Sequence, residues 1–191
     1  MTGAAVFLDR DGTLIDELGF LKRPEDLRLL PRAAAGVRAL NEAGVPVVLV
    51  TNQSGIARGL FGETELEAVH ARLQRELALQ GAHLDGLLHC PHHPEEGAPP
   101  LRRACACRKP APGLLFQAAE RFGLDLSASW IVGDSARDLE AGRRAGLAGG
   151  ILVLTGKGHA TLAELRAAGR TAEVAEDLAQ AAELVLARQG R

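Results

Sequence analysis

The chain has 191 residues, of which 47% are hydrophobic and 24% charged, and its formal net charge is −2. This length and composition are typical of one globular domain, which we expect to span residues 1–191. The chain has no basic excess and few aromatic residues (five Phe, one Trp and no Tyr), so nucleic acid is not an expected partner.

The N-terminus lacks the basic segment and the apolar core of a signal peptide, and no apolar run reaches the length of a membrane span. The sequence therefore predicts a cytoplasmic protein with no membrane partner. Its three cysteines are an odd number, which argues against a disulfide framework and favours a metal site.

Apolar runs alternate with segments of helical periodicity along the whole chain. In order, the pattern predicts a strand from residue 6 to the residue before Asp9, a loop over 16–30, a helix over 32–43, a strand over 45–50, a helix over 63–80, a strand over 84–89, an irregular segment over 90–110, a helix over 114–122, a strand over 130–132, a helix over 139–145, a strand over 151–154, a helix over 162–168, a short strand near 173–175 and a helix over 178–186. Strands that alternate with helices form a mostly parallel sheet. The predicted fold is therefore α/β, doubly wound and Rossmann-like.

Two aspartates follow the first predicted strand, in the stretch Asp9-Arg10-Asp11-Gly12-Thr13. A buried strand should not carry carboxylates in its middle because desolvating a charge is costly, but its carboxyl end faces the ligand crevice of an open α/β sheet. Residues two apart on an extended segment point the same way, so Asp9 and Asp11 could share one Mg²⁺ or one reacting phosphate. Gly12 would let the chain turn sharply. Taken alone, the motif is also compatible with a plain polar turn.

Further polar residues follow the later strands: Thr51 and Asn52, then Lys109, and then Asp134 and Asp138. Taken singly, Lys109 would be a solvated surface charge and Asp138 an ordinary acid in the first turn of a helix. Taken with the two aspartates after the first strand, the set predicts one polar site at the carboxyl edge of the sheet.

This set resembles the motifs of the haloacid dehalogenase (HAD) superfamily of phosphatases. The family pattern is Asp-x-Asp-Gly-Thr, a Thr or Ser that ends the second strand, a Lys before a helix, and Gly-Asp-x-x-x-Asp. All four motifs occur here in that order between residues 4 and 138. Each motif is weak alone, but four in the same order are specific. The resemblance implies a Mg²⁺-dependent phosphatase on a HAD sheet.

The resemblance also implies a role for each carboxylate. The Asp9 carboxylate, the Asp11 main-chain carbonyl and Asp134 would hold Mg²⁺, an ion that prefers oxygen ligands. Asp9 would be the nucleophile that forms an aspartyl-phosphate. Asp11 would protonate the leaving group and then activate the hydrolytic water.

A phosphate monoester is anionic and resists attack by another anion, so its charge must be neutralised. The resemblance implies that Thr51 and Lys109 hold the phosphoryl oxygens and stabilise charge in the transition state. Asp138 would support the metal site without binding the ion. A binding protein on an inactive HAD fold is the less favoured alternative, because the residues that catalysis needs are all present.

A second cluster of metal-ligating residue types lies in the irregular segment: Cys90, His92, Cys105 and Cys107. Three thiolates and one imidazole match a closed, structural Zn²⁺ site, which would fold a segment that has few apolar residues. Three reduced core cysteines are the alternative, but the segment is too polar for a core. His93 could replace His92 as the ligand, and the family resemblance favours His92. We therefore expect a zinc-binding loop over residues 90–109.

The predicted elements leave no room for the large cap domain that selects substrate in many HAD enzymes. A zinc loop without a cap is similar to two phosphatase families. One removes the 7-phosphate of D-glycero-D-manno-heptose 1,7-bisphosphate in ADP- or GDP-heptose synthesis for lipopolysaccharide or another glycan, and the other, the alternative here, hydrolyses histidinol phosphate in histidine synthesis. Residues 51–59, 90–94 and 107–110 favour the heptose family, and the resemblance extends over nearly the whole chain. Small members without a cap can work as monomers.

The heptose family implies substrate contacts at Arg10, Glu17, Leu18, Gly19, Phe20, Asn52, Gln53, Ser54, Arg108 and Ser135. A second phosphate on the sugar gives Arg108 a function, since a guanidinium group suits phosphate. Ser135 is a departure from the family pattern, because the heptose enzymes commonly have a Lys there that reaches a substrate phosphate. A hydroxyl brings no charge, which leaves the preferred anomer and the breadth of specificity open.

Overall fold

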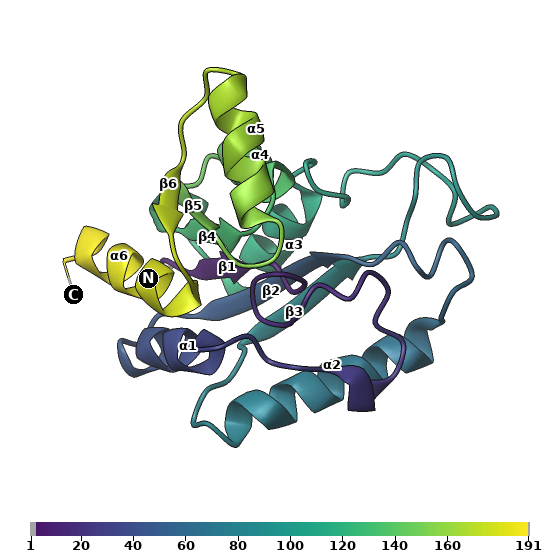
Figure 1. Ribbon diagram of the computed structural model, residues 1–191, viewed down its shortest axis with the longest axis horizontal. Coiled ribbons are helices and arrows are strands. Elements are labelled where there is room, and N and C mark those ends of the chain that lie inside the picture. The colour runs from purple at the N-terminus through teal and green to yellow at the C-terminus, as the bar shows by residue number, and fades with distance from the viewer. Residues whose placement is uncertain (1–2, 191) are drawn as a thin grey trace.

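The computed structural model describes residues 3–190, which form a parallel six-stranded sheet with the strand order β3-β2-β1-β4-β5-β6 (Figure 1). The strands are β1 (Val6–Leu8), β2 (Val47–Asn52), β3 (Gly86–Cys90), β4 (Trp130–Gly133), β5 (Gly149–Val153) and β6 (Glu173–Ala175). Leu8 of β1 is in register with Leu49 of β2 and Val132 of β4, so these three strands end at the same edge. The strand order reverses between β1 and β4, which is where open α/β sheets bind ligands.

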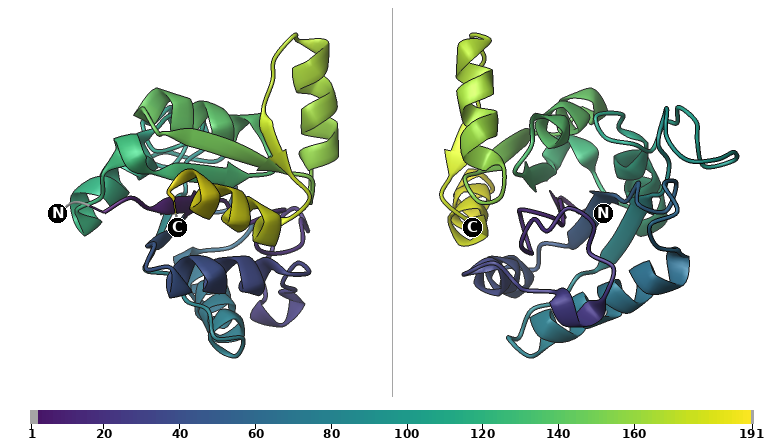
Figure 2. Two further views of the ribbon diagram at one scale, coloured as in Figure 1. Left: turned by 90° about the vertical axis from the view of Figure 1, so that its left-hand side faces the viewer. Right: turned by 45° about the vertical axis from the view of Figure 1, so that its right-hand side comes forward.

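Helices cover both faces of the sheet (Figures 1 and 2). They are α1 (Ala33–Glu42), α2 (Glu63–Ala78), α3 (Gly113–Phe122), α4 (Ala136–Ala145), α5 (Gly158–Ala167) and α6 (Leu178–Arg188), with short 3-10 turns at Pro24–Asp26 and Leu126–Ala128. Helices α1, α2 and α6 pack on one face, and α3 and α4 pack on the other. Helix α5 packs beside β5 near the outer edge of the sheet.

The central strand β1 is buried on both faces. Val6 and Leu8 belong to the core under α1, α2 and α6, whereas Phe7 belongs to the core under α3 and α4. All three side chains are fully buried, as expected for a parallel strand covered by helices on both sides. Asp9, the residue after Leu8, therefore lies where the strand leaves the core.

The predicted fold class is confirmed, with every expected strand and helix in the expected order. Boundaries differ where polar residues or glycines lie inside an element. Strand β2 runs on to Asn52, because its ladder with β3 continues past the apolar run and pairs Asn52 with Cys90. Helix α4 begins at Ala136 rather than at 139, because Ser135 and Asp138 form a capping box at its first turn.

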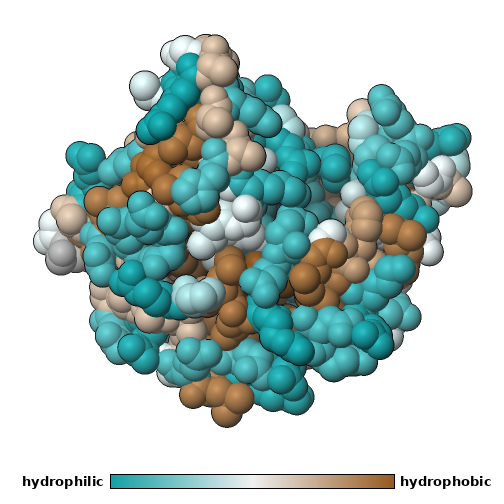
Figure 3. Space-filling view, in the orientation of Figure 1, coloured by the Kyte–Doolittle hydropathy of each residue, from teal (hydrophilic) through white to brown (hydrophobic). Residues whose placement is uncertain are grey.

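Within residues 3–190 no cap domain covers the carboxyl edge of the sheet. The segment between β3 and α3, which contains Cys105 and Cys107, extends away from the body (Figure 1). The face seen in Figure 1 is largely hydrophilic, with apolar residues in separate patches (Figure 3). None of the described helices is both long and apolar enough to cross a membrane.

Candidate active site

A cavity of about 350 Å³ opens at the carboxyl ends of β1, β2 and β4. Its walls come from the turn after β1, the loop over 16–30, the end of β2, the segment before α3 and the connections that follow β4 and β5. The lining residues are Asp9, Asp11, Glu17, Gly19, Phe20, Thr51, Asn52, Ser54, Arg58, Arg108, Lys109, Asp134, Arg137, Asp138 and Lys157. Charged side chains of both signs dominate, which suits an ionic ligand.

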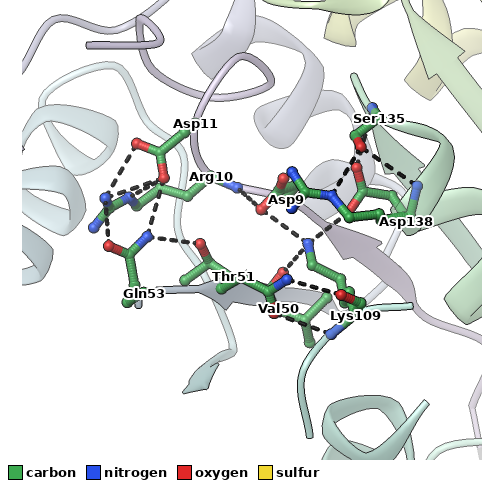
Figure 4. A network of polar contacts seen from close by, with 11 residues as sticks. Asp9, Arg10, Asp11, Val50, Thr51, Gln53, Lys109, Ser135 and Asp138 are labelled. Carbon is green, nitrogen blue, oxygen red and sulfur yellow. Dashed lines mark hydrogen bonds and ion pairs between the residues drawn. The ribbon is translucent and has the colours of Figure 1, made fainter. Parts of the chain in front are cut away.

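Lys109 lies at the centre of the site (Figure 4). Its Nζ is 2.9 Å from Asp9 Oδ1 and 2.6 Å from Asp138 Oδ1, and it donates to the main-chain carbonyl of Val50 at 2.7 Å. Burial alone would lower the pKa of Lys109, but the Asp138 and Asp9 carboxylates hold this pKa above its ordinary value. Lys109 is therefore a buried cation directed at Asp9 rather than a solvated surface charge.

The end of β2 positions this lysine. Asn52 Nδ2 donates to the main-chain carbonyl of Lys109, and Asn52 Oδ1 accepts from its main-chain N–H, both at 3.0 Å. The neighbouring Thr51 is buried but lines the cavity, and its Oγ1 accepts from Gln53 Nε2 at 2.9 Å. Because the Thr51 oxygen serves as the acceptor in this bond, its hydroxyl proton is available to a ligand.

Residues 155–157, which follow β5, close the opposite side of the site. The Lys157 main-chain N–H donates to Asp134 Oδ2 at 2.8 Å, and Thr155 Oγ1 donates to the Gly12 carbonyl at 2.6 Å. Gly12 and Gly156 have positive φ angles, and a Cβ at either position would lie within 2.3 Å of Asp134 Oδ2. Glycine is thus needed at both positions for backbone conformation and for close approach to Asp134.

Asp9, Asp134 and Asp138 bring carboxylate oxygens within 4.8 Å of one another. Burial, reinforced by the Asp9 and Asp138 carboxylates, raises the pKa of Asp134 to about 7. Burial also raises the pKa of Asp138 to about 6, against the opposing effect of Lys109. Asp138 already has partners for both oxygens, since Oδ1 contacts Lys109 and Oδ2 accepts from the Ser135 N–H. A set of oxygen donors with excess negative charge fits Mg²⁺.

A second cluster lies where β3 meets the extended loop and consists of Cys90 Sγ, His92 Nδ1, Cys105 Sγ and Cys107 Sγ. The Sγ–Sγ distances are 3.1 to 3.6 Å, and Nδ1 lies 3.4 and 3.6 Å from two of the sulfurs. A tetrahedral Zn²⁺ site with ordinary bond lengths has S–S edges of about 3.8 Å and N–S edges of about 3.5 Å. The donor types and their spacing therefore fit Zn²⁺.

His93 lies outside this cluster. Its Nδ1 accepts from the main-chain N–H groups of Glu95 and Glu96, and its Nε2 faces Arg58 at 3.2 Å. His92 instead places Nδ1 in the cluster and Nε2 2.9 Å from Arg103. Of the two adjacent histidines, the geometry therefore brings His92 to the cysteines.

The known proteins that this chain resembles are HAD-like hydrolases and heptose bisphosphate phosphatases. Residues 106–181 match the HAD-hydrolase-like family model. The D-glycero-beta-D-manno-heptose-1,7-bisphosphate 7-phosphatase of Bordetella bronchiseptica is 43% identical over 182 residues, which cover 95% of this chain and 97% of that protein. The protein of the same name from Pseudomonas aeruginosa is 40% identical over 97% of this chain and 99% of its own length. This chain belongs to that family of HAD-like phosphatases.

Solved structures of this phosphatase family share the fold. The crystal structure of the Bordetella bronchiseptica enzyme, complexed with magnesium and phosphate, matches with a TM-score of 0.85 at 41% identity and covers 97% of this chain and 99% of that one. The enzyme from Burkholderia thailandensis matches with a TM-score of 0.69 at 35% identity, over 96% of this chain and 98% of that one. The protein is thus a phosphoric monoester hydrolase with a HAD fold and no cap.

The loop over 16–30 leans over the cavity of this phosphatase and is attached on two sides. Glu17 Oε2 lies 2.7 Å from Lys157 Nζ, and the Arg58 guanidinium carbon lies 5.4 Å from the centre of the Phe20 ring. An ion pair and a cation–π contact therefore hold the loop near the place that a cap would occupy. Arg58 also pairs with Glu96, which links this loop to the segment that carries the cysteines.

Three guanidinium groups, those of Arg58, Arg108 and Arg137, line the cavity. Arg108 Nη1 donates to the His92 carbonyl at 3.3 Å, and Arg137 Nε donates to Ser135 Oγ at 3.3 Å. Burial and the like charges of Arg137 and Arg58 lower the pKa of Arg108. This concentration of positive charge suits an anionic group of the ligand.

The predicted substrate contacts fall into two groups. Those that line the cavity are Glu17, Gly19, Phe20, Asn52, Ser54 and Arg108. The described lining residues do not include Arg10, Leu18, Gln53 or Ser135. Leu18 is 52% exposed, Arg10 is 1% exposed beside Asp11, and Ser135 caps α4.

Three cations of the lining, Arg58, Arg137 and Lys157, are absent from the sequence-based prediction. Each follows the carboxyl end of a strand in the sequence, and Arg137 occupies one of the variable positions of Gly-Asp-x-x-x-Asp. Their position after a strand, together with their charge, is the sequence signal that could have identified them.

Proposed function

We propose that this chain is a Mg²⁺-dependent phosphatase that removes the 7-phosphate of D-glycero-β-D-manno-heptose 1,7-bisphosphate through an aspartyl-phosphate at Asp9. The observation that carries the proposal is the Asp9 carboxylate, held 2.9 Å from the Lys109 ammonium and grouped with Asp134. The names of relatives at about 40% identity support this substrate and this anomer. The product would feed the synthesis of ADP-heptose or GDP-heptose, according to the anomer.

In the first step an Asp9 carboxylate oxygen attacks phosphorus and forms the new P–O bond. The bond from phosphorus to O7 of the sugar breaks, its electron pair stays on O7, and Asp11 donates a proton to that oxygen. The Lys109 ammonium and the Thr51 hydroxyl stabilise the negative charge on the phosphoryl oxygens.

In the second step water attacks phosphorus while Asp11 accepts a proton from that water. The P–O bond to Asp9 breaks, its electrons return to the carboxylate, and phosphate leaves. Burial raises the pKa of Asp11, while the Arg10 guanidinium opposes this shift. A raised pKa suits a group that first gives and then accepts a proton near neutral pH.

The Asp9 carboxylate, the Asp11 main-chain carbonyl and the Asp134 carboxylate would hold Mg²⁺. When bound, the ion supplies positive charge next to the phosphoryl oxygens. Asp138 would support the site by holding Lys109 and the first turn of α4. The magnesium and phosphate in the crystal structure of the Bordetella bronchiseptica enzyme support this assignment.

We assign a structural Zn²⁺ to the cluster of Cys90, His92, Cys105 and Cys107. With four protein donors no position is left for water, so the ion would have no part in the chemistry. Arg108 and Lys109 follow Cys107 directly, so a folded zinc loop would position both cations.

The 1-phosphate of the substrate would bind to Arg108 and Arg137. Ser135 lacks the charge that the heptose family commonly places there, but its Oγ holds the Arg137 side chain toward the cavity wall at 3.3 Å. Arg137 would thus supply the positive charge from a position two residues further along. The sugar between the two phosphates would contact the lining residues of the predicted set, which are Glu17, Gly19, Phe20, Asn52 and Ser54.

The test is kcat/KM for phosphate release with Mg²⁺ on the β and α anomers of heptose 1,7-bisphosphate and on histidinol phosphate, with Asp9→Asn as the blank. We expect a preference for the β anomer. A preference for histidinol phosphate would retain the chemistry but replace the substrate. Activity that survives in Asp9→Asn would mean that another residue is the nucleophile, and no release by the natural chain would favour a binding protein.

A further inference from the structure

A buried polar network surrounds the Asp11 side chain, which turns away from Asp9 (Figure 4). Arg10 Nε donates to Asp11 Oδ2 at 3.2 Å, and Arg10 Nη2 donates to Asp11 Oδ1 at 3.1 Å. Gln53 Nε2 donates to Asp11 Oδ2 at 3.0 Å, and Gln53 Oε1 accepts from Arg10 Nη2 at 3.0 Å. Arg10 and Gln53 thus hold the carboxylate and also hold each other.

The far end of the network is His70 on α2. Its Nε2 lies 3.3 Å from Arg10 Nη1, and both side chains are buried. Burial, and then the charges of Arg10 and His89, lower the pKa of His70 to about 3. The imidazole is therefore neutral near pH 7, and Nε2 can accept the Arg10 proton. Helix α2 in this way fixes the side of the guanidinium that faces away from Asp11.

Gln53 also ties the network to the rest of the site. Its main-chain N–H donates to the Cys90 carbonyl at 2.8 Å, and its Nε2 donates to Thr51 Oγ1 as well as to Asp11. One amide group therefore sets the position of Asp11 relative to Thr51. Neither Arg10 nor Gln53 nor His70 is among the described residues that line the cavity, so their effect on a ligand is indirect.

We infer that Arg10, Gln53 and His70 are positioning residues that orient the Asp11 carboxylate for proton transfer. Oδ2 accepts from both Arg10 and Gln53, whereas in the described part of the chain Oδ1 accepts from Arg10 Nη2 alone. Oδ1 is thus the oxygen with room for the proton that passes to the leaving oxygen and later returns from water. This inference rests on the proposed role of Asp11 as the general acid and base.

The test uses two leaving groups that differ in their need for a proton. Heptose 1,7-bisphosphate releases an alkoxide, which needs protonation, whereas p-nitrophenyl phosphate releases a stable phenolate, which does not. We would measure the first-turnover rate of bond cleavage for both in Gln53→Leu, with Mg²⁺ present. General acid catalysis contributes about 10²-fold or more, so we expect cleavage of the heptose to slow by at least about 10-fold and the nitrophenolate burst by less than about 3-fold.

Two further variants make the result decisive for the network. His70→Phe keeps a ring but loses the acceptor, and we expect the same selective loss at a smaller size. His89→Phe is the matched control, since His89 is a neighbouring, partly exposed histidine that pairs with Glu63 and has no hydrogen bond to Arg10 among the described contacts. A loss in His89→Phe equal to that in His70→Phe would show a packing effect and overturn the inference.

Asp11→Asn separates failure of the inference from failure of the proposed function. If Asp11→Asn shows the selective loss but Gln53→Leu slows both substrates equally, or neither, then Asp11 is the acid and the positioning role is wrong. If Asp11→Asn itself lacks the selective loss, the proposed role of Asp11 fails and the inference fails with it. Melting temperature and zinc content of each variant, compared with the natural chain, identify any variant that is damaged in folding.

Discussion

Two clusters of ligating side chains lie at the same edge of the sheet and differ in how complete they are. The cluster of Cys90, His92, Cys105 and Cys107 has four donor atoms within 4.8 Å of one another, at the end of β3 and in the loop that follows it. The carboxylates of Asp9, Asp134 and Asp138 instead face a cavity. Asp9 and Asp138 both contact the Lys109 ammonium group, and burial raises the pKa of Asp134 and of Asp138.

The difference suggests that the fold assigns a structural role to one cluster and a catalytic role to the other. When four protein donors surround an ion, no coordination position is left for water or substrate. The ion then has a structural role. An incomplete set with unbalanced charge keeps its affinity for an ion and for a substrate. The two clusters are connected, because Arg108 and Lys109 follow Cys107 directly and Arg108 donates to the His92 carbonyl. We therefore expect the closed cluster, which is Cys90, His92, Cys105 and Cys107, to position the cations next to the open cluster, which is Asp9, Asp134 and Asp138.

The largest effect should come from the open cluster. Asp9→Asn replaces the attacking oxygen by a poor nucleophile, so we expect phosphate release to fall by more than about 10⁴-fold. Zinc content and the melting temperature should remain close to those of the natural chain, because the closed cluster is intact. Steady-state kinetics, with metal analysis of the same sample, would check this. Joint loss of activity and zinc would contradict the separation of the two clusters.

The closed cluster should affect catalysis less and folding more. We expect Cys107→Ser to lose Zn²⁺, to melt at a lower temperature and to lose up to about 10²-fold in kcat/KM, because a small displacement of Lys109 is enough for such a loss.

The adjacent histidines provide a matched pair for the same test. His92→Asn should lose zinc as Cys107→Ser does, whereas His93→Asn should keep it. Retention of zinc in His92→Asn and loss in His93→Asn would reverse the assignment of the ligand.

Motifs identified most of the open cluster from sequence alone, because parallel strands bring their carboxyl ends to one edge whatever the loops do. Asp9, Thr51 and Asp134 lie at the carboxyl ends of three adjacent strands, so their proximity required only the strand order. Lys109 could be interpreted singly as a surface charge, and its burial depends on contacts with Asp138 and Val50 that no local pattern contains.

The sequence does not predict the directions of several charged side chains in and around the site. Arg10 lies between two residues of the site, and its guanidinium group contacts both the neighbouring Asp11 carboxylate and His70, which belongs to a helix sixty positions away in the chain. Arg137 in the first turn of α4 and Lys157 between β5 and α5 also line the cavity. Such directions depend on tertiary packing, so neither periodicity nor motif spacing predicts them.

A smaller effect should distinguish binding of the second phosphate from the chemistry of the first. We expect Arg137→Ala to lower kcat/KM about 10-fold for heptose 1,7-bisphosphate, mainly through KM, since a hydrogen bond to a charged group contributes about 1.5–3 kcal/mol. Heptose 7-phosphate, which lacks the other phosphate, should be affected much less.

The control for this prediction is Arg143→Ala on the same helix, because Arg143 is exposed and pairs with Glu140 away from the cavity. Arg108→Ala should behave as Arg137→Ala does. Equal losses on the bisphosphate and the monophosphate would place both arginines at the reacting phosphate instead.

The last effect we predict is a pH dependence that only the open cluster should show. Burial raises the pKa of Asp134 to about 7, so without metal the folded chain holds a proton there that the unfolded chain releases near pH 4. The stability of the metal-free chain should therefore decline as the pH rises from about 4 to 7. Mg²⁺ competes with that proton, so its affinity should fall about tenfold for each pH unit below 7.

The measurement is the rise in melting temperature on addition of Mg²⁺, which should be larger at pH 8 than at pH 5.5. Asp134→Asn carries no titrating carboxyl at this position and should lose both the response and its pH dependence. An equal Mg²⁺ response at the two pH values in the natural chain would mean that Asp134 does not exchange its proton for the ion. Another carboxylate of the open cluster would then have to exchange a proton for the ion. Asp138 would be that carboxylate, because its pKa is raised to about 6.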